Sequence, residues 1–147
     1  MVDKQLSIVF LITVLLGLSF SVYGQEDITG VWEVLDNETG EPKAHVKIFK
    51  RNETLVGRVV KYLPKADLFV CASCPDSVEG KPLKDVDLLW GLQAKKDQWT
   101  GGFIMDPRRG GVYRLSARLS DQKLRLRGYI GIPLFGQTIW WNRVEKE

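Results

Sequence analysis

The stretch YRLSARLSDQKLRLRGYI, residues 113–130, alternates apolar and polar side chains in each of its two halves. The apolar positions are Tyr113, Leu115, Ala117 and Leu119 in the first half, and Leu124, Leu126, Gly128 and Ile130 in the second. Alternation with a period of two is typical of strands that have one buried face and one solvated face. The polar segment at residues 120–122 is typical of a tight turn. The stretch therefore predicts an antiparallel hairpin whose arginines point outward.

Similar alternating runs recur along the chain and are separated by polar or glycine-containing turns. The expected strands are residues 30–34, 45–50, 55–61, 86–92, 99–105, 111–119, 123–130 and 136–144. The later connections are short, which favours a meander in which sequential strands pair with each other. Closing eight strands into a barrel would remove the exposed sheet edges. We therefore expect an all-β fold, an eight-stranded antiparallel up-and-down barrel, whose interior can hold packed side chains or one small ligand.

The first 24 residues have the order of segments found in a secretory signal peptide. Lys4 precedes an uncharged apolar run at residues 6–20, and Val22 and Gly24 occupy the small-residue positions before a cleavage site. The apolar run is shorter than the roughly 20 residues that a spanning helix needs. No cysteine lies at the cleavage site, which disfavours a lipoprotein anchor. We expect residues 1–24 to be removed and residues 25–147 to form one exported domain, periplasmic or secreted.

The charge balance of the chain is mildly basic. Its 21 lysines and arginines exceed its 18 acidic residues by three. This balance favours solubility and weak attraction to anionic surfaces, and it falls short of the basic footprint of a nucleic-acid-binding domain. Export also separates the protein from nucleic acid, so we expect no nucleic-acid partner.

The two ends of the expected barrel carry a matched pair of residues. Trp32 follows Gly30 on the first expected strand, and Arg143 lies on the last. The first and last strands of a closed meander are neighbours, so the guanidinium can stack on the indole. This arrangement is similar to the structural signature of lipocalin-type barrels, and it gives Gly30, Trp32 and Arg143 a structural role.

Several longer stretches carry a closer resemblance. They are Gly30-Val-Trp32, a CxxCP loop followed by GKPL at residues 80–83, WTGGFIMDP at 99–107, GVY at 111–113, LRLRGYIG at 124–131 and GQTIWWNR at 136–143. In this order they resemble a family of small exported bacterial proteins of unknown function with a lipocalin-like barrel. The cysteine loop is similar to the variant found in Bacteroidetes-like members. The resemblance implies a bacterial envelope or secreted location, and it implies no activity.

No motif in the chain indicates catalysis. His45 is the only histidine, and no nucleophile or orienting acid lies near it in sequence as a hydrolytic triad would require. Asp106, followed by Pro107, fits hairpin turn chemistry better than acid–base chemistry. The glycines open no phosphate-binding loop. We expect no enzyme, no catalytic residue, no metal and no cofactor; a weak enzyme would use Tyr113, Asp106 or His45.

Aromatic side chains offer the best candidates for ligand contact. They are Trp90, Phe103, Tyr113 and Tyr129. The interval at residues 62–85 is longer than most loops in compact domains, and such loops often cover binding sites. The leading hypothesis is an exported, non-catalytic binding protein of the bacterial cell envelope. It would hold a small apolar or amphipathic, lipid-like ligand in the barrel, with this interval near one mouth.

A second hypothesis uses the outside of the barrel. The outward positions of the two clearest strands include Arg114, Arg118, Arg125 and Arg127. They would form a basic surface for an envelope protein or polymer partner, and the barrel would then be filled by its own side chains. An ordinary solvated face would also have this composition.

The two cysteines, Cys71 and Cys74, lie three positions apart in the long interval. A structural zinc site needs four ligands, and the chain has only these thiols and one distant histidine. A thioredoxin-like couple belongs at a strand-to-helix junction, which an all-β chain does not offer. Export places the pair in an oxidising compartment. We predict a Cys71–Cys74 disulfide that tightens the loop.

Overall fold

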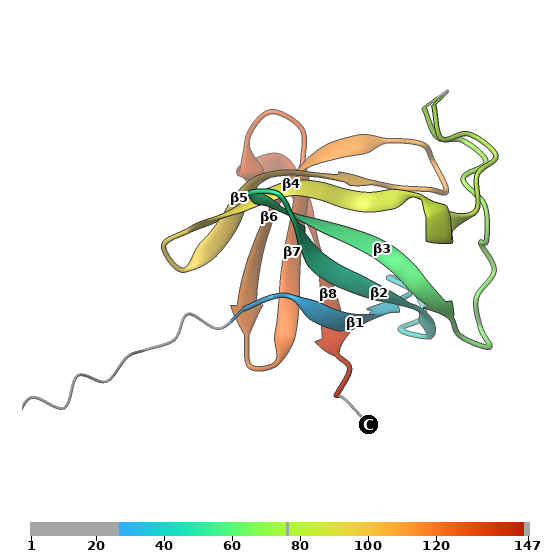
Figure 1. Ribbon diagram of the computed structural model, residues 1–147, viewed down its shortest axis with the longest axis horizontal. Coiled ribbons are helices and arrows are strands. Elements are labelled where there is room, and N and C mark those ends of the chain that lie inside the picture. The colour runs from blue at the N-terminus through green and yellow to red at the C-terminus, as the bar shows by residue number, and fades with distance from the viewer. Residues whose placement is uncertain (1–26, 76, 146–147) are drawn as a thin grey trace, which may run out of the picture.

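The computed structural model of the protein describes residues 27–75 and 77–145. The expected signal peptide lies outside the described residues. The strands are β1 (Gly30–Leu35), β2 (Pro42–Arg51), β3 (Thr54–Tyr62), β4 (Asp87–Lys95), β5 (Gln98–Met105), β6 (Val112–Ser120), β7 (Lys123–Tyr129) and β8 (Gly136–Arg143). Two short 3-10 turns, η1 (Leu83–Asp85) and η2 (Pro133–Phe135), precede β4 and β8. Figure 1 shows the strands wrapping around a common axis.

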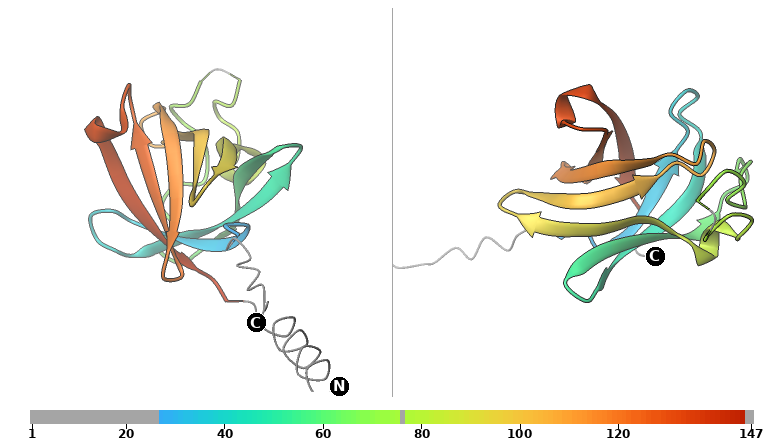
Figure 2. Two further views of the ribbon diagram at one scale, coloured as in Figure 1. Left: turned by 90° about the vertical axis from the view of Figure 1, so that its left-hand side faces the viewer. Right: turned by 90° about the horizontal axis from the view of Figure 1, so that it is seen from above.

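Each strand pairs antiparallel with the next, and β1 pairs with β8 to close the barrel. In the closing pair Trp32 lies opposite Arg143 and Val34 lies opposite Trp141. Figure 2 shows the same arrangement from two further directions. The predicted eight-stranded up-and-down barrel is confirmed. In this topology the connections β1–β2, β3–β4, β5–β6 and β7–β8 lie at one end of the barrel.

The hairpin of β6 and β7 follows the predicted alternation for most of its length. Leu115, Ala117, Leu124 and Leu126 are buried, whereas the intervening arginines are exposed or half-buried. Ile130 departs from the prediction because it is 71% exposed. Strand β7 ends at Tyr129, and Gly131, with φ +74°, turns the chain away from the core. The inward-facing positions of this strand therefore end at Gly128, although the apolar pattern predicts that they continue to Ile130.

Trp32 closes the end of the barrel opposite these connections. It is fully buried, and its indole N–H donates to the carbonyl of Ile28 at 2.9 Å. The guanidinium carbon of Arg143 lies 4.3 Å from the centroid of the Trp32 ring. The same guanidinium donates to the carbonyls of Thr29 and Asp27 at 3.2 and 2.8 Å. These contacts join the first and last strands and seal this end with an aromatic ring.

Gly30 is required by this plug for two reasons. Its φ of +124° lies in a region that side-chain-bearing residues rarely adopt. A Cβ there would also approach the Arg143 guanidinium to 3.2 Å. The Gly30–Trp32 motif therefore combines backbone freedom at the start of β1 with the ring that Arg143 covers.

A charge cluster joins β2, β3 and β4 on the barrel wall. Nη1 and Nη2 of Arg51 donate to the Asp87 carboxylate at 2.6 and 3.2 Å, and Nε of Arg58 donates to it at 2.5 Å. Burial raises the pKa of the Asp87 carboxyl, but the hydrogen bonds from the two arginines outweigh burial and leave that pKa below its usual value. The folded state therefore favours the ionised carboxylate.

Substituting Asp87→Asn is expected to lower the free energy of unfolding at pH 7 by about 1–2 kcal/mol, the range for partly exposed charge-assisted hydrogen bonds. The unfolded carboxyl titrates near pH 4 and the folded one lower, so this contribution is present above pH 4 and is lost as pH falls through the folded pKa. Urea unfolding of the wild type and the variant at pH 7 and pH 3 measures the difference in their free energies of unfolding. A difference that is larger at pH 3 than at pH 7 would contradict a stabilising role for the ionised Asp87 carboxylate.

Candidate functional site

A cavity of about 730 Å³ occupies the barrel interior and opens among the connections at the mouth. Its walls come from β1, β2, β3, β4, β5, β6, β7 and β8, so every strand contributes to it. The apolar wall residues are Val34, Ala44, Val46, Val59, Leu83, Leu88, Ile104, Met105, Leu126, Ile139 and Trp141. The interior is therefore hollow toward the mouth and solid toward Trp32.

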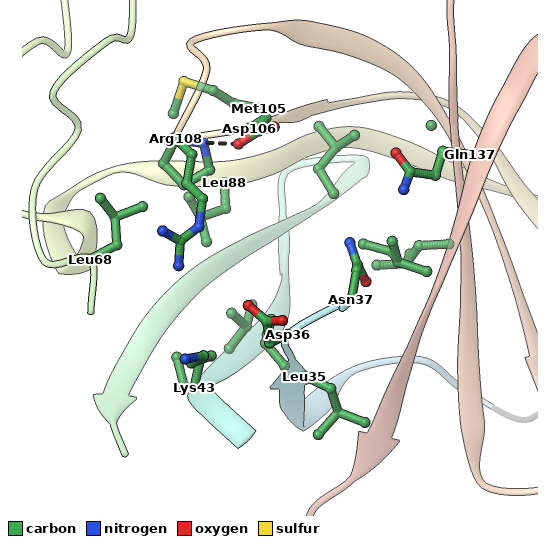
Figure 3. A pocket seen from close by; sticks show the side chains of 18 of the residues that line it. Leu35, Asp36, Asn37, Lys43, Leu68, Leu88, Met105, Asp106, Arg108 and Gln137 are labelled. Atoms are coloured by element: carbon green, nitrogen blue, oxygen red, sulfur yellow. Dashed lines mark hydrogen bonds between the residues drawn. The ribbon is translucent and has the colours of Figure 1, made fainter. Parts of the chain in front are cut away.

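The rim of the cavity is polar. Figure 3 labels Asp36 and Asn37 from the β1–β2 connection, Lys43 from β2, Arg108 from the β5–β6 connection and Gln137 from β8. Apolar walls beneath a rim of charged and amide groups are complementary to a molecule with an apolar body and a polar head.

Two of the rim carboxylates are used by their own turns. Asp36 accepts hydrogen bonds from the backbone N–H groups of Thr39 and Glu38, at 2.9 and 3.0 Å, and these lower its pKa. Asp106 accepts a 2.9 Å bond from the backbone N–H of Arg108. Both aspartates thus shape hairpin turns, as the sequence predicts for Asp106.

A third carboxylate links two connections across the rim. Asp67, in the β3–β4 connection, accepts a 2.5 Å hydrogen bond from the Arg108 guanidinium and lies 3.8 Å from Nζ of Lys43. The hydrogen bond from Arg108 is the main cause of its lowered pKa. In Figure 3 the Arg108 side chain extends toward Leu68 and Lys43. The neighbouring Arg109 also lines the cavity, and within the described part of the chain its side chain has no ion-pair partner.

The long β3–β4 connection is fixed to the barrel at several points. The backbone N–H of Leu63 donates to the carbonyl of Lys43 on β2 at 3.0 Å, and Tyr62 Oη on β3 donates to the carbonyl of Phe69 at 3.0 Å. The Tyr62 and Phe69 rings meet edge to face with their centroids 4.8 Å apart. Burial raises the pKa of the Tyr62 phenol. Ala66, Asp67 and Leu68 line the cavity, so the connection forms one side of the mouth.

Cys71 and Cys74 form the disulfide in this connection. Both residues are buried, and Sγ of Cys71 lies 4.0 Å from Sδ of Met105, which lines the cavity. The backbone of Cys71 also pairs with Lys81 and Gly80, at 2.9 Å each. The pair therefore does more than tighten a loop, because it also packs the connection onto the barrel core.

The buried indole of Trp141 has an unpaired polar atom. Trp141 is 3% exposed and lines the cavity, and its N–H has no hydrogen-bond partner among the described residues. A buried donor without a partner costs about 1–3 kcal/mol. An acceptor carried into the cavity by a ligand would remove this cost if the side chains covering the nitrogen shifted to admit it.

The four aromatic candidates separate into two pairs. Tyr113 and Tyr129 line the cavity. Trp90 and Phe103 do not; they stack on each other from paired positions of β4 and β5, with centroids 5.9 Å apart and Phe103 39% exposed. Gly91 and Gly101, with φ of +78° and +76°, interrupt the alternation of these strands. The structure therefore assigns cavity contact to the tyrosines.

The outward arginines also differ from one another. Arg118 is exposed and pairs with Asp97 at 2.9 Å. Nε of Arg127 donates to the carbonyl of Pro133 in the β7–β8 connection, and Arg114 is exposed.

The residues considered for a weak enzyme separate in the same way. His45 is not among the cavity-lining residues, unlike Asp106 and Tyr113. Across residues 27–75 and 77–145, no group of three or more His, Cys, Asp or Glu side chains is placed to hold a metal ion.

Several site residues are not evident from the sequence. Lys43 lies on β2, and Asp67 and Arg108 come from two different connections; only the closed barrel brings the three to one rim. Trp141 could be placed on the last strand, but the adjacent Trp140 leaves open which indole points inward. The structure settles this, since Trp141 is buried and Trp140 is 44% exposed.

The closed eight-stranded meander, the arginine-covered tryptophan and the hollow interior define a lipocalin-like barrel. A solved structure from the human pathogen Helicobacter pylori, described as a protein of the lipocalin family, matches this fold with a TM-score of 0.70. The match has 16% sequence identity and covers 81% of this chain and 84% of that one. Residues 30–143 match the model of a family described as uncharacterized proteins conserved in bacteria, DUF2147, and the chain belongs to this family.

No curated protein is significantly similar to the chain. Within the described residues, no helix has the length and apolar character needed to cross a membrane.

Proposed function

We propose that the protein is an exported, non-catalytic binding protein of the bacterial cell envelope that holds a small apolar or amphipathic molecule in its barrel. The observation that carries this proposal is the cavity of about 730 Å³, with apolar walls and a polar rim. Ligand pockets typically enclose roughly 300–1,000 Å³. An apolar chain entering this space would release water from apolar walls, which is favourable in proportion to the area covered.

The alternative, a filled barrel that acts only through its outer surface, is less well supported. Such a barrel would leave no space among the wall side chains, and the cavity counts against it. The three mouth residues Lys43, Asp67 and Arg108 instead form a fixed polar rim, as expected where a head group stays near water.

The proposal is tested with the fluorescent fatty acid 11-(dansylamino)undecanoic acid. Its emission is expected to increase and shift to the blue on titration with the protein, and palmitate is expected to displace it. At palmitate concentrations 100-fold above Kd, mass action adds about 2.7 kcal/mol to the stability of the folded state, so the melting temperature should rise. A probe that stays dim throughout, together with an unchanged melting temperature, would count against the proposal.

Export is proposed from the first 24 residues, which have the segment order of a signal peptide. Mass spectrometry of the protein recovered from the periplasm or medium is expected to give a mature chain beginning at Gln25. Recovery only from the cytoplasm, with residue 1 retained, would exclude export.

A further inference from the structure

The β7–β8 connection presents apolar side chains to solvent. Ile130, Ile132, Leu134 and Phe135 are 71%, 53%, 74% and 77% exposed, and they occur within six consecutive residues. We call residues 130–135 the apolar loop. In Figure 1 and in the right-hand view of Figure 2 it stands clear of the strands. Contiguous exposed apolar groups of this kind mark an interaction surface.

Arg127 holds the apolar loop in place. Its Nε donates to the carbonyl of Pro133 at 2.9 Å, its Nη2 to that of Leu134 at 3.1 Å, and its Nη1 to Oγ1 of Thr138 at 2.8 Å. The backbone N–H of Phe135 also donates to the carbonyl of Ile132. The exposed side chains are therefore presented on a braced support, and the guanidinium of Arg127 is not free to bind a partner.

The wall beneath the apolar loop is strongly basic. The outward positions of β6 and β7 carry Arg114, Arg118, Lys123, Arg125 and Arg127, and residues 107–144 contain one acidic residue, Asp121. Arg114 lies opposite Tyr129, next to the loop, and Arg125 lies opposite the exposed Trp140. Among the described residues neither Arg114 nor Arg125 has an ion-pair partner. A protruding apolar tip flanked by arginine and tryptophan is complementary to an anionic lipid surface.

We propose that the apolar loop and the outer face of β6–β8 dock on an anionic phospholipid bilayer. The apolar side chains enter the acyl region, and Arg114, Arg125 and Trp140 lie at the headgroup level. The loop is a convex tip, which suits insertion into lipid better than it suits the flat contact of a protein interface. Ile130 and Phe135 also line the cavity, so docking brings the mouth to the bilayer. Docking through this surface is independent of whether the cavity binds a ligand.

Vesicle flotation tests the proposal with the protein as cells process it, its N-terminus verified by mass spectrometry. Binding is expected at low salt to vesicles of phosphatidylglycerol and phosphatidylcholine in equal parts, at least about 10-fold stronger than to phosphatidylcholine alone. Leu134→Asp is expected to reduce the bound fraction at least about 10-fold. The matched control Val60→Asp, at an exposed apolar position of β3, should bind as the wild type does.

Reversal of charge at two positions, Arg114→Glu with Arg125→Glu, should abolish the preference for phosphatidylglycerol. A variant whose cavity is blocked, Ala44→Trp, should still float with vesicles, which separates docking from uptake of a lipid into the barrel. Absence of vesicle binding at low salt, with or without capture of a protein partner by the loop, would overturn the proposal. Equal vesicle binding by Leu134→Asp and wild type would also overturn it.

Discussion

Replacing Ala44 with tryptophan is expected to weaken binding of 11-(dansylamino)undecanoic acid at least about 10-fold and to leave the barrel folded. Ala44 lies on β2 two residues from Val46, and both line the cavity. An indole at this position would occupy the space that the alkyl chain needs. Because the residue faces a cavity, the larger side chain should cause little of the strain that overpacking a filled core produces.

The matched control is Ala94→Trp, on the exposed end of β4 and away from the cavity. Fluorescence titration of the probe measures the affinity of the three proteins, and their melting temperatures establish that each is folded. Equal affinity of Ala44→Trp and wild type would place the probe elsewhere than in the barrel.

Replacing Trp32 with alanine is expected to lower the free energy of unfolding by about 3–5 kcal/mol, the range for loss of a buried large aromatic side chain. The indole is fully buried, donates to Ile28 and is covered by Arg143. Domains of this size are stable by only about 5–15 kcal/mol, so this loss is a substantial part of the total stability.

Urea unfolding followed by circular dichroism measures the effect of Trp32→Ala. The control Arg143→Lys keeps the charge but loses the planar guanidinium, and it should cost less, about 1–2 kcal/mol. A loss below about 1 kcal/mol for Trp32→Ala would contradict its role as the plug of the barrel.

The barrel could be predicted from the sequence because strands with one buried face alternate apolar and polar residues. Leu115, Leu124 and Leu126 alternate with polar residues, and all three are buried. The pattern fails where glycine changes the backbone. Gly131 follows Ile130, which lies exposed at the mouth, and Gly91 and Gly101 lie next to or near Trp90 and Phe103, which do not line the cavity. Positive φ at a particular glycine depends on tertiary packing, so the sequence alone does not reveal it.

The mouth of the cavity was less predictable than its walls. Asp67 and Arg108 lie 41 positions apart in turns of different hairpins, and their hydrogen bond depends on how these connections meet above the barrel. Neither residue belongs to a motif. The inward position of Tyr113 could be predicted from the sequence, because this residue continues the apolar face of β6. The structure places it in the cavity wall.

The cavity and the apolar loop together suggest a path for a ligand. Ile130 and Phe135 belong to both features, so a molecule leaving a bilayer at the loop would meet the mouth first. The two features remain separable by experiment, since Leu134→Asp changes the loop without altering a cavity wall and Ala44→Trp changes the wall without altering the loop.

The most direct test of interior binding is methyl NMR with stearic acid that carries a nitroxide at carbon 16. At an equimolar ratio, the signals of Val46, Val59 and Leu126 are expected to broaden, because their methyl groups line the cavity. Those of Ile132 and Leu134, in the exposed loop, should remain sharp. Broadening confined to the loop methyls, with Val46, Val59 and Leu126 unaffected, would contradict the account.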